Sequence, residues 1–76
     1  MGILSLLLSG KRIKFMSTDI DKYQYDENSS KLLQIIDDEI TGFEISVIEV
    51  NEIFITTDWG NESTSTLFED ELIFVD

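Results

Sequence analysis

Residues 43–76 limit the possible folds more than any other part of the sequence, because they are rich in Ile, Val, Phe, Thr and Trp. These residue types fit the pleated, half-buried surface of a β-sheet. Alternating apolar and polar residues predict strands over about 43–50, 53–59, 63–68 and 72–75, joined as an antiparallel meander. Turns are expected around Asn51 and at Gly60-Asn61. The apolar positions change face between Val47 and Ile48, so we expect a β-bulge there or a strand covered on both faces.

One helix is expected in the middle of the chain, over about residues 30–41, with Ser29 or Ser30 as its N-cap and Gly42 just past its end. Its predicted apolar stripe spans about 160° of a helical wheel and comprises Leu32, Leu33, Ile35, Ile36 and Ile40. Asp37, Asp38 and Glu39 would then occupy the last turn, where the helix dipole disfavours each negative charge by about 0.3–1 kcal/mol. We therefore treat these three acids as candidate partner-binding residues, with simple solvation of exposed charges as the alternative.

The N-terminal part gives weaker signals. Residues 3–8 form an apolar run that suits either a short strand or a short helix, and we prefer a strand that pairs with residues 12–16 as a hairpin. Residues 17–28 are predicted to form a surface loop held by Ile20, Tyr23 or Tyr25. The sequence as a whole predicts a single α+β domain over residues 1–76, in which a small antiparallel sheet of four to six strands packs against the helix at about 30–41.

Several kinds of chemistry have no residues to support them. The chain contains no Cys and no His, which excludes disulfides, the commonest zinc ligands and a Ser-His catalytic pair. Asp19 and Asp21 begin like a calcium-binding loop, but Tyr23 replaces the third ligand and Gln24 the required glycine. The apolar run at residues 3–8 is too short to span a bilayer, and the basic residues follow it instead of preceding it as in a signal peptide. We expect a cytoplasmic protein that is not an enzyme, binds no metal or cofactor and contacts no membrane.

The charge distribution is the most informative functional signal. The formal net charge is −11. All five Lys and Arg lie in the first 31 residues together with four acids, whereas the remaining 45 residues carry twelve acids and no base. Surfaces that only maintain solubility usually mix both signs, so a one-signed region predicts steering toward a positively charged partner. Twelve carboxylates carry the charge of about 20 Å of duplex DNA, which is enough for mimicry if they form one patch.

In size, charge and lack of catalytic residues, the chain resembles the small acidic inhibitors that phages and mobile elements encode, the anti-CRISPR and other DNA-mimic proteins. The acids that carry this resemblance are Glu44, Glu49, Glu52, Asp58, Glu62, Glu69, Asp70 and Glu71. The resemblance implies a stoichiometric inhibitor, located in the host cytoplasm if it is phage-encoded. Such an inhibitor would bind the basic nucleic-acid-binding surface of a nuclease or CRISPR-Cas effector and would not contact nucleic acid itself.

Two other classes remain open. An immunity protein that neutralises a toxin nuclease would also be an acidic cover on a basic site, and a structural subunit would use Phe54, Phe68 or Phe74 to anchor a permanent partner. In the inhibitor, Phe54 or Trp59 would provide the apolar anchor, although a Trp in so small a domain more often belongs to the core. The predicted partner-binding residues are Asp37, Asp38, Glu39, Glu44, Glu49, Glu52, Phe54, Asp58, Glu69, Asp70 and Glu71.

Overall fold

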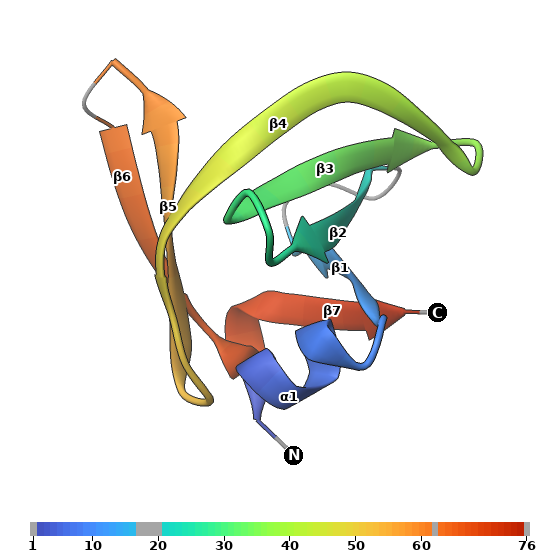
Figure 1. The fold of residues 1–76 in the computed structure, drawn as a ribbon. Helices are drawn as coiled ribbons and strands as arrows, with labels where there is room; N and C mark the ends of the chain where they lie inside the picture. The colour runs from blue at the N-terminus through green and yellow to red at the C-terminus, as the bar shows by residue number, and fades with distance from the viewer. Residues whose placement is uncertain (1, 17–20, 62, 76) are drawn as a thin grey trace.

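The computed structural model describes residues 2–16, 21–61 and 63–75. In these ranges, seven strands form one antiparallel sheet in the order β6-β5-β4-β3-β2-β1-β7, curled into a half-barrel (Figure 1). The elements are α1 (Ile3–Leu8), β1 (Arg12–Phe15), β2 (Lys22–Asp26), β3 (Lys31–Ile36), β4 (Glu39–Val50), β5 (Phe54–Gly60), β6 (Ser63–Phe68), the 3-10 turn η1 (Glu69–Glu71) and β7 (Leu72–Val75).

The predicted α+β architecture is wrong, because residues 30–41 form β3, a tight turn and the start of β4 instead of a helix. Ile36 pairs with Glu39, and the two residues between them, Asp37 and Asp38, have φ angles of 54° and 63°. Positive φ at both central residues is the conformation that joins two strands most directly, and Asp tolerates it better than most residues. The apolar run at 32–36 has a bulge between Leu33 and Ile35, and this irregularity gives it a spacing that resembles a helical stripe.

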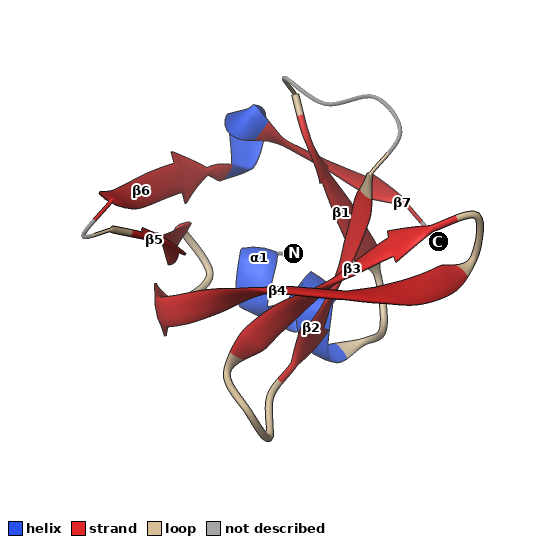
Figure 2. Cartoon of the chain, turned by 90° about the horizontal axis from the view of Figure 1, so that it is seen from above, coloured by secondary structure: helices blue, strands red, loops and turns tan. Residues whose placement is uncertain are grey.

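The preferred N-terminal hairpin is also wrong. Residues 3–8 form α1, which buries Ile3 and Leu7 and closes the lower end of the half-barrel (Figures 1 and 2). β1 has the predicted alternation, with Ile13 and Phe15 buried. The loop expected at 17–28 contains a strand, β2, whose Tyr23 is buried. Ile20 and Asp19 lie outside the described residues.

The strands predicted after residue 43 are confirmed. β4, β5 and β6 form a meander, the register shifts between Val47 and Glu49 as expected for a bulge, and positive φ angles at Gly60 and Asn61 mark the predicted turn. β7 does not extend this meander. After η1, the chain crosses the opening of the half-barrel and β7 pairs with β1. The two edges of the sheet are therefore β6 and β7.

The hydrophobic core lies on the concave side of the sheet and includes α1. Its buried residues are Ile3, Leu7, Ile13, Phe15, Tyr23, Leu32, Ile45, Val47, Ile55 and Leu72. Because side chains alternate along a strand, the neighbours of these core residues point to the convex side. Thr57 is a fully buried polar residue, and it fixes the inward face of β5 together with Ile55.

Candidate partner-binding surface

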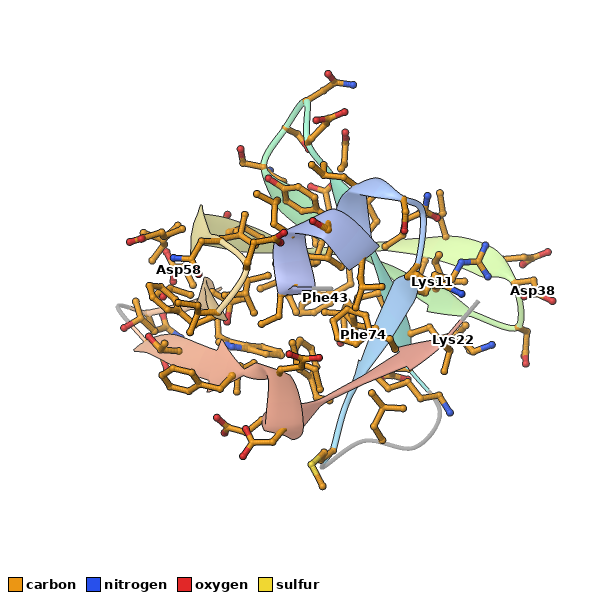
Figure 3. All side chains as sticks on the ribbon, turned by 90° about the horizontal axis from the view of Figure 1, so that it is seen from below. Lys11, Lys22, Asp38, Phe43, Asp58 and Phe74 are labelled. Atoms are coloured by element: carbon orange, nitrogen blue, oxygen red, sulfur yellow. The ribbon has the colours of Figure 1, made fainter. Side chains whose placement is uncertain are left out.

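The predicted partner-binding residues lie in four separate places. One group is at the β3–β4 turn, a second lies on the convex side of β4 and β5, a third lies on η1, and Glu52 lies apart from them in the connection between β4 and β5, against α1. Glu39 and Glu49 lie ten residues apart along β4, a strand that bends over the whole length of the sheet (Figure 1). Figure 3 shows Asp38 and Asp58 at opposite sides of the molecule. The structure does not gather these residues into one patch.

The acids of the β3–β4 turn do not lie at the end of a helix, contrary to the prediction from the sequence. Asp37, Asp38 and Glu39 were candidates because negative charge is unfavourable at the end of a helix, and here no helix exists. Their exposed positions require no special compensation. Asp38 Oδ1 also lies 3.5 Å from Nη1 of Arg12, so this acid already has a basic neighbour within the chain.

The second group shares a continuous surface, which we call the convex face. It consists of the outward residues of β4, β5 and β6, namely Glu44, Ser46, Glu49, Phe54, Thr56, Asp58, Thr64, Thr66 and Phe68. The strand register arranges most of them in rows, because Ser46 pairs with Asp58 and Asp58 with Thr64, while Glu49 pairs with Thr56 and Thr56 with Thr66. Rows are about 6.6 Å apart along a strand and strands about 4.8 Å apart.

Charge and apolar surface meet on the convex face. Phe54 and Phe68 form a cross-strand pair with ring centroids 6.0 Å apart in an edge-to-face arrangement. Phe68 is exposed, and Phe54 is half-buried. The nearest basic side chain from the adjoining strand is Lys31 of β3, whose Nζ lies 3.2 Å from Glu44 Oε1. Glu49 and Asp58 are thus the acids of the face that this lysine does not pair with.

Glu52, predicted to bind a partner, has a structural role that no local pattern predicts. Its carboxylate accepts hydrogen bonds from the backbone N–H of Ser5, at 2.7 Å, and from the Ser5 hydroxyl. Its backbone oxygen accepts a hydrogen bond from the N–H of Ile3 at 3.1 Å. These contacts satisfy free N–H groups in the first turn of α1. The hydrogen bond from the Ser5 hydroxyl, and then that from the Ser5 backbone, lowers the pKa of Glu52.

The acids of η1 are exposed and directly follow Phe68. Glu71 Oε1 accepts a hydrogen bond from the Phe68 N–H at 3.1 Å, so this acid fixes the start of the turn. Glu69 and Asp70 belong to the same turn and are exposed. Glu62 belongs to the acids that suggested an inhibitor, but it lies outside the described residues.

Sequence reasoning missed an aromatic pocket at the open side of the half-barrel. Trp59, expected in the core, is 41% exposed. Its ring centroid lies 5.4 Å from that of Phe15, which lies 5.0 Å from that of Tyr23. Phe15, Trp59, Ser65 and Leu67 line a pocket with a volume of about 180 Å³. Alternation along β5 and β6 places Trp59, Ser65 and Leu67 on the concave side, but only the curl of the sheet brings Phe15 next to them.

Within the described ranges, no group of three or more acidic, Cys or His side chains is arranged to hold a metal ion. None of the helices in those ranges has the length and apolar character needed to cross a membrane. On the convex face, the side chains are carboxylates, hydroxyls and aromatic rings. No family model matches the chain, and neither the curated proteins nor the solved structures include one with significant similarity to it.

Proposed function

We propose that this protein is a non-enzymatic inhibitor that binds a basic nucleic-acid-binding surface of another protein, such as a nuclease or CRISPR-Cas effector, and blocks it by occupying it. The supporting observation is the convex face, where Glu44, Glu49 and Asp58 share one side of the sheet with the Phe54–Phe68 pair, on strands that contain no Lys or Arg. The proposed site of action is the cytoplasm, which is the host cytoplasm if the protein is phage-encoded.

Each part of the convex face has a distinct role in this proposal. The acids attract lysines and arginines of the partner and raise the association rate. The ring pair of Phe54 and Phe68 supplies the apolar anchor, because buried aromatic side chains contribute most to the affinity of protein interfaces. Asp58 Oδ1 accepts a hydrogen bond from the N–H of Gly60 at 2.8 Å, which holds its carboxylate in place before the partner arrives.

The size of the convex face sets the scale of the mimicry. From the row of Phe54 to the row of Glu44, which lies one row beyond Asp58, it extends about 20 Å along the strands, and about 10 Å separate β4 from β6. Its three carboxylates equal the charge of about 5 Å of duplex, compared with about 20 Å for all twelve acids of residues 32–76. The face therefore suits a local cluster of basic residues better than the full length of a DNA-binding channel. The acids elsewhere contribute a long-range attractive field.

Charge reversal at matched positions tests the convex face. The basic partner is first captured from the native host with the tagged protein and identified. Two double variants are then compared, Glu49→Lys with Asp58→Lys on the convex face and Glu69→Lys with Asp70→Lys on η1. Both change the net charge by the same amount. We expect the convex-face variant to bind the partner at least about tenfold more weakly and to stop competing with nucleic acid in a gel shift, whereas the η1 variant mainly lowers the association rate.

Equal losses in the two variants would show that only the total charge matters and would contradict a defined interface on the convex face. Wild-type protein that binds the partner without displacing its nucleic acid would contradict inhibition by occupancy. An immunity protein would use the same kind of surface, so the identity of the captured protein decides between the classes. A toxin nuclease encoded next to this gene favours immunity, and a phage or mobile-element context favours a counter-defence inhibitor.

A further inference from the structure

The half-barrel is open along β6, and the free edge of that strand borders the aromatic pocket. Within the described residues, β6 pairs only with β5. The chain then leaves through η1 and joins β1 as β7, so the opening remains between the two edges of the sheet (Figure 2). Ser65 and Leu67 of β6 line the pocket together with Phe15 of β1. An added strand at this edge would therefore pass directly beside the pocket.

From Thr64 to Phe68, beyond the register shift at the Gly60↔Ser63 pair, the β6 edge lacks the devices that normally prevent strand addition. Edges are usually protected by charged residues, proline, bulges or very short strands. β6 has six residues, none of them charged or proline, and its register with β5 runs without interruption from Phe54↔Phe68 to Asp58↔Thr64. The opposite edge, β7, has only four residues, and shortness is itself a protective device. The two edges are thus unequal, and β6 is the one suited to pairing.

The pocket has the size of one side chain. Sites for small-molecule ligands usually have volumes of about 300–1,000 Å³, which is larger than the volume of about 180 Å³ found here. A cavity of about 150 Å³ is enough to hold benzene. Phe15, Trp59 and Leu67 give this pocket an apolar lining, so its best occupant is a single apolar side chain.

We propose that β6 binds an extended segment of a basic protein as an added strand, with one apolar side chain of that segment in the Phe15–Trp59–Leu67 pocket. Side chains alternate along the added strand, so its other face points to the convex side. Lys or Arg there would lie beside Thr64 and Thr66, about 10 Å or two strand spacings from Asp58 on β5. Long basic side chains can approach its carboxylate across that distance. The preferred segment therefore alternates basic and small or apolar residues.

This docking site presupposes the proposed function, because the basic character of the segment follows from the acidic convex face. A second copy of this chain is a poor occupant. Each copy carries a formal net charge of −11, and a dimer through β6 would join two convex faces that bear acids only. All charged residues of both faces are acidic, so electrostatic repulsion between the two copies would oppose that pairing.

A peptide titration tests the site directly. The 15N-labelled protein is titrated with the acetylated and amidated peptide KSKLKSK and, separately, with KSKSKSK and ESELESE. We expect KSKLKSK to shift the amide signals of β6 and the Trp59 indole signal and to slow hydrogen exchange in β6. The peptide without leucine should bind at least about tenfold more weakly, because it leaves the pocket unfilled. The acidic peptide should show no binding at low salt.

Two neighbouring variants separate the pocket from the surface. Ser65→Gln places a larger neutral side chain into the pocket, whereas Thr66→Gln places the same side chain on the convex face. We expect Ser65→Gln to weaken KSKLKSK binding at least about tenfold and Thr66→Gln to change it less than about threefold. Circular dichroism and thermal melts confirm that both variants are folded. N-methylation of the backbone on either side of the peptide leucine should abolish binding if strand pairing occurs.

The outcomes distinguish this docking site from the proposed function. If both basic peptides bind equally and shift convex-face signals without β6, the docking site is wrong while attraction to basic partners stands. If ESELESE binds as tightly as KSKLKSK, the basic segment is wrong, and the acids lose their proposed role as well. Absence of any binding by KSKLKSK at low salt, or a dimer formed through β6 without peptide, overturns the docking site. In each case, the gel-shift competition between this protein and nucleic acid for the basic partner tests the proposed function independently of the docking site.

Discussion

A single acidic residue, Glu52, holds α1 in the half-barrel. The helix has six residues and begins after Gly2, which has no side chain to cap it. Glu52 supplies the cap from another part of the chain, and the fit is close. A Cβ atom on Gly2 would lie 2.7 Å from the Cα atom of Glu52, closer than real Cβ contacts, so the glycine is required by the approach of the two segments. A short apolar N-terminal run is helical here because of this tertiary contact and the burial of Ile3 and Leu7.

The lowered pKa of Glu52 predicts a specific pH dependence of stability. A carboxyl whose pKa is lower in the folded state stabilises the fold fully above its unfolded pKa, here 4.5, and loses that contribution as the pH falls through the folded pKa. We expect Glu52→Gln to lower the melting temperature at pH 7, with the difference from the wild type shrinking below about pH 4.5. Thermal melts by circular dichroism between pH 3 and 7 measure this difference.

Glu49→Gln is the matched control, because it removes the same charge from the convex face without touching α1. The control corrects for the general relief of repulsion that acidification brings to an acidic protein. A wild-type advantage over Glu52→Gln that stays constant from pH 7 to pH 3 would show that the carboxylate does not cap α1 in solution.

At the scale of elements, the hairpin of β3 and β4 shows where a local pattern has two solutions. The spacing of Leu32, Leu33, Ile35, Ile36 and Ile40 fits a helical wheel, but it also fits a strand with a bulge followed by a turn and a second strand. The Asp37-Asp38 turn decides between them, because both residues adopt positive φ. Asp tolerates that conformation, but Asp-Asp is a much weaker sequence signal for a two-residue hairpin turn than Asn-Gly. The three acids at positions 37–39 argue against a helix, because negative charge is unfavourable at a helix C-terminus.

The strands after residue 43 could be predicted because their information is local. Alternation fixes which side chains share a face, so the shared face of Phe54 and Asp58 follows from the sequence alone. The change of face after Val47 also follows from it, but the sequence allows either a bulge or a strand covered on both faces, and the register shift shows the bulge. The pairing of β7 with β1 depends on contacts between the two ends of the chain, which no local pattern contains. The pocket depends on the curl of the whole sheet, which brings Phe15 of β1 next to Trp59 of β5, and no local pattern contains that contact either.

A glycine substitution distinguishes the hairpin from a helix by the sign of its effect. Asp37→Gly removes the energetic cost of positive φ for a residue with a side chain. Part of this gain in stability is lost, because glycine makes the unfolded chain more flexible and folding then costs more entropy. We expect a net gain of about 0.5 kcal/mol, or about 2–4 °C in melting temperature for a domain of this size. In the helix first expected here, the same change would cost about 1 kcal/mol.

Glu39→Gly is the control for this substitution. It removes the same charge one element away, at the start of β4, where no positive φ is present to be relieved. Glycine within a strand weakens it, so this variant should melt at a lower temperature than the wild type. Chemical denaturation of the three proteins in urea gives the stability order, and an Asp37→Gly variant that is less stable than the wild type would contradict the turn.

At the scale of the whole molecule, charge opposes the fold. A formal net charge of −11 is spread over a domain with a radius of gyration of 11.3 Å. This radius is close to the screening length of about 10 Å in 0.1 M salt, so added salt weakens repulsion across most of the molecule. We expect the melting temperature to rise between about 0.01 M and 0.2 M NaCl. A fall over that range would show that attractive pairs such as Lys31–Glu44 outweigh the repulsion.

Neutralising acids outside the convex face should separate stability from binding. The variant combines Asp37→Asn, Glu39→Gln, Glu69→Gln and Asp70→Asn, which removes four negative charges and changes the formal net charge from −11 to −7. We expect this variant to melt at a higher temperature than the wild type in low salt and to depend less on salt, because repulsion is reduced. Its affinity for the basic partner should fall only through a slower association, since Glu49, Asp58 and the phenylalanine pair are unchanged. A loss of affinity as large as that of the Glu49→Lys and Asp58→Lys variant would mean that the field of the whole molecule drives binding, and that the convex face has no special role.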